Sequence, residues 1–263
     1  MKKILFLTVL FVCLQTILNA QNYNDYSQKS IEEVIKKGIN PMDVGDLKID
    51  AIKEKAFLHH LSKFKRLNNF EISNCDTLPK EIFEFKFVKL MRIYGVKHFP
   101  NGSYEKLQNL TKIEVYGIND KKGEMSSLPD DFGKLPTLKE FRANNNSFTE
   151  FPMALTKIIA LESVIIANNK ISNIPKEIGN LKFLTSLVLS TNPIKFLPKE
   201  IGLLKNLTRL RVEETLITTI PFELAQLKNL EYISVSNLIS EEYIAEFKRK
   251  CVNSFLEIRV HKK

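Results

Sequence analysis

An apolar residue followed by proline recurs at nearly even intervals along the chain. The pairs are Leu78-Pro79, Phe99-Pro100, Leu128-Pro129, Phe151-Pro152, Ile174-Pro175, Leu197-Pro198 and Ile220-Pro221. Seven of the ten prolines therefore mark a single position of a repeat. A repeat with a period in this range predicts a solenoid, because each unit is too small to bury its apolar face alone and must stack on its neighbours.

The repeat is clearest between Leu184 and Gly202, where LTSLVLSTNPIKFLPKEIG fits the pattern LxxLxLxxNxIxxLPxEIG. With the first leucine as position 1, the units begin at Leu67, Val88, Leu110, Leu138, Leu161, Leu184, Leu207 and Leu230. Positions 4 and 6 are apolar in every unit, which predicts a short strand with one buried side. The frame extends outward to Leu47 and Leu256, so we expect about ten strands, the outer two being capping turns.

This unit resembles the 23-residue LPxxIGxLxxLxxLxL leucine-rich repeat of bacterial and Ras-suppressor-like proteins, over roughly residues 44–260. The resemblance implies an α/β fold: a curved solenoid with a parallel β-sheet on its concave face and irregular or 3₁₀ segments on its convex face. It also implies a binding module, because members of this family mostly bind other macromolecules and do not catalyse reactions.

Position 9 of such a repeat is usually asparagine, whose side chain turns inward to satisfy loop backbone groups. Asn146, Asn169 and Asn192 meet this rule, and Cys75 substitutes for asparagine. The residues that depart from the rule are Val96, Ile118, Thr215 and Leu238. We call the row of inward-facing polar side chains at position 9 the polar ladder. We expect this ladder to be confined to the middle of the solenoid.

Residues 1–20 have the pattern of a secretory signal peptide, with Lys2 and Lys3 before an apolar run and a cleavage site near Ala20. The run is shorter than a membrane span, and Val12 makes a poor lipid-attachment signal at Cys13. We expect a cleaved chain without a transmembrane segment that is secreted, periplasmic or displayed on the cell surface. The mature chain stays basic, because cleavage removes two lysines and no acidic residue.

Residues 21–66 are predicted to form an N-terminal cap, residues 67–240 the repeats and residues 241–263 a C-terminal cap. The first cap is predicted to hold a helix from Ser30 to Lys37, a strand at 44–50 and a helical segment at 52–64. The second is predicted to hold a helix at 241–251 and a strand at 255–260. These helices cover the open ends of the core or, alternatively, form partner-binding surfaces.

One unit is 28 residues long, and its extra material lies at 117–127. Such an insertion is either a solvated loop or a contribution to binding.

We find no pattern of catalytic, metal-binding or cofactor-binding residues, and predict no enzyme activity and no cofactor. Cys75 and Cys251 are too far apart for a disulfide and are expected to be buried thiols. Gly133, Gly179 and Gly202 recur at one position, where we expect a turn that needs backbone freedom. An enzyme carrying the solenoid as a recognition arm is the less favoured alternative.

Because positions 4 and 6 of each repeat unit face inward, positions 5 and 7 of the unit face outward on the concave side of the sheet. Arg92, Tyr94, Tyr116 and Arg142 are therefore predicted to cluster over three adjacent strands. Four further residues extend this candidate protein-binding surface, namely Asn144, Ile165, Val188 and Arg211. Tyrosine and arginine often anchor protein interfaces. The alternative is that these side chains stabilise only their own sheet.

A row of lysines lies two residues before the strand units, namely Lys65, Lys86, Lys182, Lys205 and Lys228. Such a row is able to attract an anionic polysaccharide, a lipid headgroup or another envelope component as a second kind of partner, and we predict no specific nucleic-acid binding. The alternative is a solvated face, because glutamates such as Glu177 and Glu200 offset part of the charge.

Overall fold

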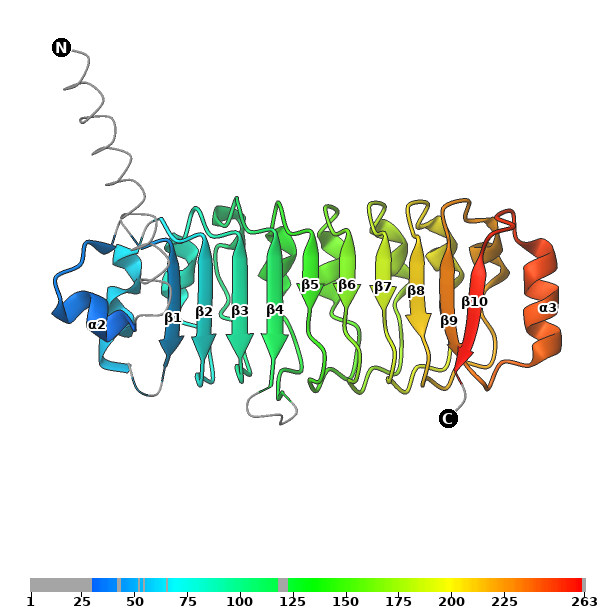
Figure 1. Ribbon diagram of the computed structural model, residues 1–263, viewed down its shortest axis with the longest axis horizontal. Helices are drawn as coiled ribbons and strands as arrows, with labels where there is room; N and C mark the ends of the chain where they lie inside the picture. The colour runs from blue at the N-terminus through cyan, green and yellow to red at the C-terminus, as the bar shows by residue number, and fades with distance from the viewer. Residues whose placement is uncertain are drawn as a thin grey trace, which may run out of the picture.

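The chain folds as one ten-stranded parallel sheet in which the strands follow each other in sequence order (Figure 1). The computed structural model describes residues 30–41, 44–51, 53, 55–64, 66–117 and 123–261. The strands are β1 (Asp46–Asp50), β2 (Asn69–Ser73), β3 (Leu90–Tyr94), β4 (Lys112–Tyr116), β5 (Glu140–Arg142), β6 (Ser163–Ile165), β7 (Ser186–Val188), β8 (Arg209–Val212), β9 (Tyr232–Ser236) and β10 (Glu257–His261). The predicted number of strands is confirmed, and the first and last begin two residues later than expected.

The repeat frame sets the register of the sheet. Equivalent positions of neighbouring units pair directly, as in Phe141 with Val164 and Val164 with Leu187. The side chains at positions 4 and 6 are buried along the whole solenoid, because the strands stack them into one continuous core.

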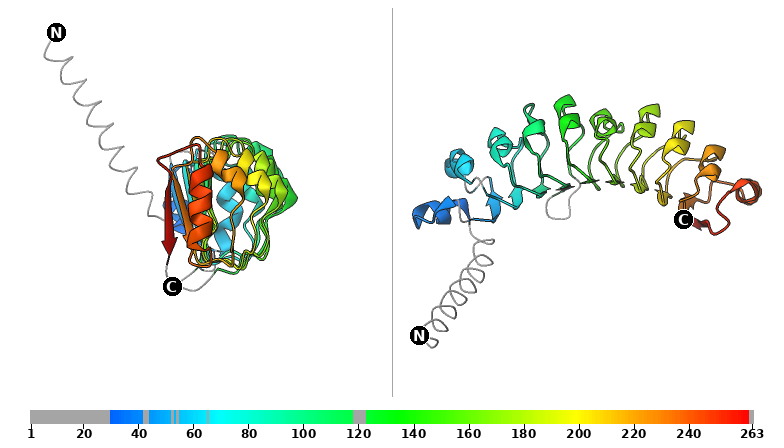
Figure 2. Two further views of the ribbon diagram at one scale, coloured as in Figure 1. Left: turned by 90° about the vertical axis from the view of Figure 1, so that its right-hand side faces the viewer. Right: turned by 90° about the horizontal axis from the view of Figure 1, so that it is seen from above.

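Short 3₁₀ segments form the convex side and give the solenoid its arched shape (Figure 2). They are η3 (Lys80–Glu84), η4 (Tyr104–Lys106), η5 (Asp130–Lys134), η6 (Met153–Lys157), η7 (Lys176–Asn180), η8 (Lys199–Leu203) and η9 (Phe222–Gln226). All but η4 begin directly after the repeat proline, whose fixed φ suits a helix start and whose missing N–H is not needed there.

The recurring glycines serve close packing, so the prediction that they provide backbone freedom is wrong. Among the described glycines, positive φ occurs at Gly38 and Gly95. A Cβ atom on Gly202 would lie 2.5 Å from the Cβ of Glu223, and one on Gly179 would lie 2.9 Å from the carbonyl oxygen of Glu200. Side chains at these positions would force neighbouring convex segments apart.

Helices lie at both ends of the solenoid (Figure 1). At the N-terminal end, α2 (Ile31–Lys36) buries Ile31 and Val34, and η2 (Lys55–Lys63) is a 3₁₀ helix shorter than the predicted 52–64 segment. At the other end, α3 (Glu241–Lys250) is capped by Ser240, whose hydroxyl accepts a hydrogen bond from the Tyr243 N–H. α3 buries Phe247 and packs against η9.

The prediction for the two cysteines needs correction, and the predictions for residues 1–20 and for part of the insertion stay predictions. Cys75 and Cys251 are free thiols that pack against the core, but they are partly buried instead of buried as expected. Residues 1–20, with Cys13, and residues 118–122 of the insertion lie outside the described residues. The rest of the insertion packs on the solenoid, because Met125 is fully buried and the Gly123 N–H donates to the Asn145 carbonyl.

Candidate binding surface

The residues predicted for binding form two rows across adjacent strands. In the first row Arg92 on β3 pairs with Glu114 on β4, which pairs with Arg142 on β5. The row continues through Ile165, Val188 and Arg211 on β6 to β8. In the second row Tyr94 lies directly beside Tyr116. The sheet register thus brings the predicted residues together.

Glu114 is the electrostatic centre of the first row. Its carboxylate lies 3.1 Å from Arg92 Nε, 2.9 Å from Lys112 Nζ and 3.9 Å from Arg142 Nε, and its side chain is only 8% exposed. Arg142 and Lys112 also pair with Glu140. Burial alone would raise the pKa of Glu114, but hydrogen bonds from Lys112 and Arg92 outweigh burial and hold this pKa below its ordinary value. Arg92 is therefore held in place by the buried Glu114, and Arg142 is held mainly by Glu140.

Tyr94 and Tyr116 form a stacked aromatic pair on the same face. Their ring centroids lie 5.3 Å apart with an interplanar angle of 23°. Burial raises the pKa of both hydroxyls, and the nearby carboxylates of Glu71 and Glu114 raise it further. Both hydroxyls consequently stay protonated near neutral pH and are able to donate hydrogen bonds.

Three of the predicted residues are less available for a partner than the sequence indicated. The Asn144 side-chain oxygen accepts a hydrogen bond from the Ala167 N–H at 2.8 Å, so this amide supports the sheet. Val188 is buried. Arg211 is tied to the buried Glu213, whose pKa is lowered by hydrogen bonds, the Arg211 bond among them, although burial acts in the opposite direction.

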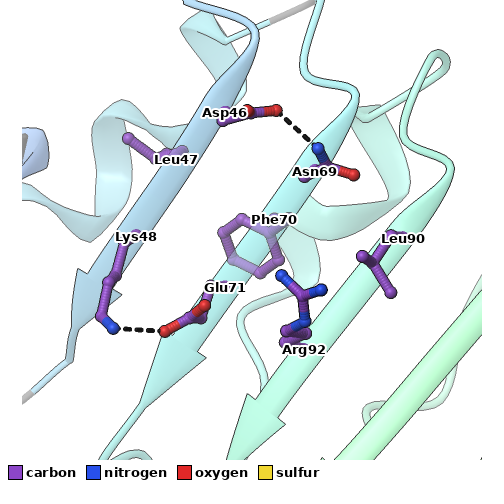
Figure 3. Close-up of a pocket in the computed structure, with 8 residues that line it drawn as sticks. All are labelled: Asp46, Leu47, Lys48, Asn69, Phe70, Glu71, Leu90 and Arg92. Carbon is purple, nitrogen blue, oxygen red and sulfur yellow. Dashed lines mark hydrogen bonds and ion pairs between the residues drawn. The ribbon is translucent and has the colours of Figure 1, made fainter. Parts of the chain in front are cut away.

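A shallow pocket of about 210 Å³ extends the surface over β1 to β3 (Figure 3). Lys48 pairs with Glu71 across its lower edge, at 2.6 Å. At its upper edge the Asn69 amide donates to Asp46 at 2.8 Å. Neither this pocket nor the role of Glu114 was predicted from the sequence. The signal available in the sequence is the alternation of charge at position 5, from Lys48 through Glu71, Arg92 and Glu114 to Arg142.

The described residues hold no group of three or more histidine, cysteine, aspartate or glutamate side chains placed to bind a metal ion. No helix within the described ranges is both long enough and apolar enough to pass through a lipid bilayer.

The predicted asparagine ladder is present behind the concave face. The Asn169 amide donates to the carbonyls of Ala143, Ile166 and Ala167, and its oxygen accepts from the Phe148 N–H. Asn192 makes the equivalent bonds one unit later. The ladder reaches one unit further than predicted, because the Thr215 hydroxyl donates to the Val212 carbonyl at 2.7 Å.

A protein-family model described as a leucine-rich repeat region matches residues 150–251. This match falls on the units with the most regular spacing. The chain folds as a leucine-rich-repeat solenoid. No curated protein matches this chain by sequence.

Solved structures of other leucine-rich-repeat proteins share its fold. An internalin (inlF) from Listeria monocytogenes is 18% identical with a TM-score of 0.51, covering 83% of this chain and 68% of the internalin. The leucine-rich repeat domain of the type III effector XopL is 17% identical with a TM-score of 0.57, covering 80% of this chain and 81% of the domain.

A third structure is the ectodomain of the plant membrane receptor kinase GASSHO1/SCHENGEN3 from Arabidopsis thaliana, in complex with CASPARIAN STRIP INTEGRITY FACTOR 2. It is 18% identical with a TM-score of 0.57, and the match covers 74% of this chain but only 24% of the ectodomain. At these identities the similarities establish the fold alone.

Proposed function

We propose that this protein is an exported, non-enzymatic module that binds a protein partner through the concave face of β1 to β6. The observation that carries the proposal is the stacked pair of Tyr94 and Tyr116 beside Arg92 and Arg142 on the open face of the sheet. Stacked rings lose little conformational entropy when a partner covers them, and tyrosine and arginine are enriched among the residues that dominate binding energy.

The charges of this face favour a partner of mixed character. Lys48, Arg92 and Arg142 alternate with Glu71 and Glu114, so the surface has no excess charge that would select a polyanion. A partner segment lying across the strands would meet alternating donors and acceptors around an aromatic centre. The pocket over β1 to β3 has room for one side chain of that segment.

Export rests on the signal-peptide pattern of residues 1–20, which precede all described elements. Binding outside the cytoplasm is consistent with the plant ectodomain that shares the fold and was solved in a complex.

The test is a capture experiment with the chain from Gln21 onward as bait, using envelope and culture-fluid fractions of the source cells. Tyr94→Ala combined with Tyr116→Ala is expected to abolish retention of the specific partner, because the aromatic centre is lost. Tyr232→Ala is the matched control, since this tyrosine lies on the distant β9. Circular dichroism spectra must show that both variants are folded.

If the double tyrosine variant retains its partner as well as the wild-type protein does, the concave-face proposal is wrong. The same conclusion follows if only lysine substitutions outside the sheet abolish retention.

A further inference from the structure

The two rims of the solenoid differ sharply in charge. We define the turn rim as the six-residue segments that begin at the last residue of each η segment, namely 84–89, 106–111, 134–139, 157–162, 180–185, 203–208 and 226–231. It holds nine lysines and three glutamates, and every one of these lysines is exposed. We define the loop rim as the described segments that follow the strands, namely 74–79, 95–100, 123–128, 145–150, 168–173, 191–196 and 214–219. It holds three lysines and four acidic residues.

Several turn-rim lysines are also left without an ionic partner. On the loop rim, Lys97 pairs with both Asp76 and Glu124. On the turn rim, Lys134, Lys139 and Lys157 have acidic partners. Within the described chain, Lys182 and Lys228 form no ion pair, and the Lys205 ammonium donates only to the Gly202 carbonyl. These ammonium groups remain available for external anions.

Large apolar side chains are exposed within two residues of a turn-rim lysine on three consecutive units. Ile159, Phe183 and Leu203 are 66%, 58% and 47% exposed. Ile159 and Phe183 closely follow Lys157 and Lys182 in the chain, and Leu203, the last residue of η8, lies two residues before Lys205. Lysines alone would fit a solvated face, but lysines interleaved with exposed aromatic and aliphatic groups are typical of surfaces that enter the headgroup boundary of a membrane.

Phe183 occupies a repeat position that three other units fill with asparagine and two fill with Phe87 and Ala160. The equivalent residues Asn109, Asn206 and Asn229 each donate a side-chain hydrogen bond to a carbonyl of the preceding turn, at 2.7, 2.7 and 2.9 Å. Phenylalanine has no such donor and leaves its ring in solvent. Phe183 therefore gives up a recurrent stabilising contact of the fold, and its presence needs another explanation.

The shape of the solenoid allows the whole turn rim to meet a flat surface. All strands point the same way, so the turns that enter them line one long edge, the upper edge in Figure 1. Seen from above that edge, the solenoid arches within the plane of the view (Figure 2), and Figure 1 shows the turns along the edge at similar height. A flat layer of negative charge can contact these turns together.

We propose that the turn rim docks the protein on a bilayer that contains anionic phospholipids. The lysine ammonium groups bind lipid phosphates, and Ile159, Phe183 and Leu203 enter the boundary between headgroups and acyl chains. The concave face stays clear of the bilayer and open to its partner, so the inference stands independently of the proposed protein-binding site.

The test is vesicle flotation with the chain from Gln21 onward, which retains every described element and lacks the apolar N-terminal segment. The probes are phosphatidylcholine vesicles with and without phosphatidylglycerol. Binding is expected only to the vesicles with phosphatidylglycerol and should weaken as salt is raised. The combined change Lys182→Glu, Lys205→Glu and Lys228→Glu should weaken binding by about 100-fold.

The variant Phe183→Asn distinguishes insertion of apolar side chains into the bilayer from attraction between the lysines and the lipid phosphates. This change keeps all charges and restores the residue used in neighbouring turns, so the protein should stay folded while vesicle binding weakens by about tenfold. The matched charge control is Lys170→Glu with Lys195→Glu on the loop rim, which should leave binding within about twofold of wild type.

Three results would overturn the proposal. The first is no binding to vesicles with phosphatidylglycerol. The second is unchanged vesicle binding by Phe183→Asn together with equal binding to dextran sulfate, which would assign the rim to soluble polyanions. The third is an equal loss of binding in the loop-rim variant, which would show that only net charge matters.

Discussion

The two halves of the solenoid hold their loops in different ways. In the second half, from β5 to β8, the inward side chains of Asn146, Asn169 and Asn192 bond to loop backbone groups. In the first half this position is Cys75 or Val96, and the core from β2 to the start of β5 holds clustered aromatic rings. Phe132 contacts Phe99, Tyr104 and Phe141 at centroid distances of 5.2, 5.3 and 5.7 Å.

This difference explains where the candidate site lies. An asparagine ladder requires every unit to follow the same path, and the units there all have 23 residues. Aromatic packing tolerates units of different length, such as the 28-residue unit. The strands of the first half, β1 to β4, have five residues each, whereas β5 to β7 have three. The longer strands display more concave side chains, and they carry the tyrosines and most of the ion pairs.

The largest expected effect is the loss of the buried ring cluster around Phe132. Phe132→Ala should lower the free energy of unfolding by about 4 kcal/mol, because it leaves a cavity among three rings. Tyr104→Phe is the milder control and should cost about 1 kcal/mol by removing the hydroxyl that donates to the Pro100 carbonyl at 2.7 Å. Urea unfolding measures both, and equal effects would contradict the aromatic account.

The ladder of the second half is tested by Asn169→Ala. The change leaves carbonyls and an N–H group without partners in a buried site, so the free energy of unfolding should fall by about 3 kcal/mol. Cys75→Ala at the equivalent position of the first half should cost about 1 kcal/mol or less. Comparable losses at the two sites would remove the distinction between the halves.

The backbone of Thr191, in the second half of the solenoid, is strained. It has a left-handed backbone with φ of 57°, which is unfavourable for a β-branched residue, whereas Asn145 and Asn168 hold the same conformation in neighbouring units. Thr191→Asn should therefore raise the free energy of unfolding by about 1 kcal/mol. The reciprocal change Asn168→Thr should destabilise the protein, and thermal unfolding of both variants checks the pair.

The smallest effect concerns the charges of the first half. The pKa of Glu114 is lower in the folded protein than its ordinary value, so the ionised carboxylate contributes stability at neutral pH. This contribution is lost as pH falls from about 4.5 through the lower folded pKa. The wild-type protein should lose more stability than Glu114→Gln between pH 6 and pH 3, as measured by urea unfolding at each pH. Parallel pH profiles would contradict the role assigned to this acid.

The sequence predicted the features that repeat and missed those that depend on contacts between units. Leu187, Asn169 and the strand order follow from the 23-residue frame, because stacking places equal positions side by side. The close approach at Gly202 and the convergence of three cations on Glu114 are set by the paths of adjacent units, which periodicity does not specify. Asn144 faced outward as predicted from its position, but its amide is used by the sheet.

The central claim is that the partner binds over the tyrosines of the first half. Hydroxyl-radical footprinting with mass spectrometry tests it directly, comparing the free protein with its captured complex. The reporters are Tyr94 and Tyr116 on the concave face, with Phe196 and Phe255 as exposed references elsewhere. The account predicts that the partner lowers oxidation of both tyrosines and leaves both phenylalanines unchanged. Unchanged oxidation of Tyr94 and Tyr116 in the complex would contradict it.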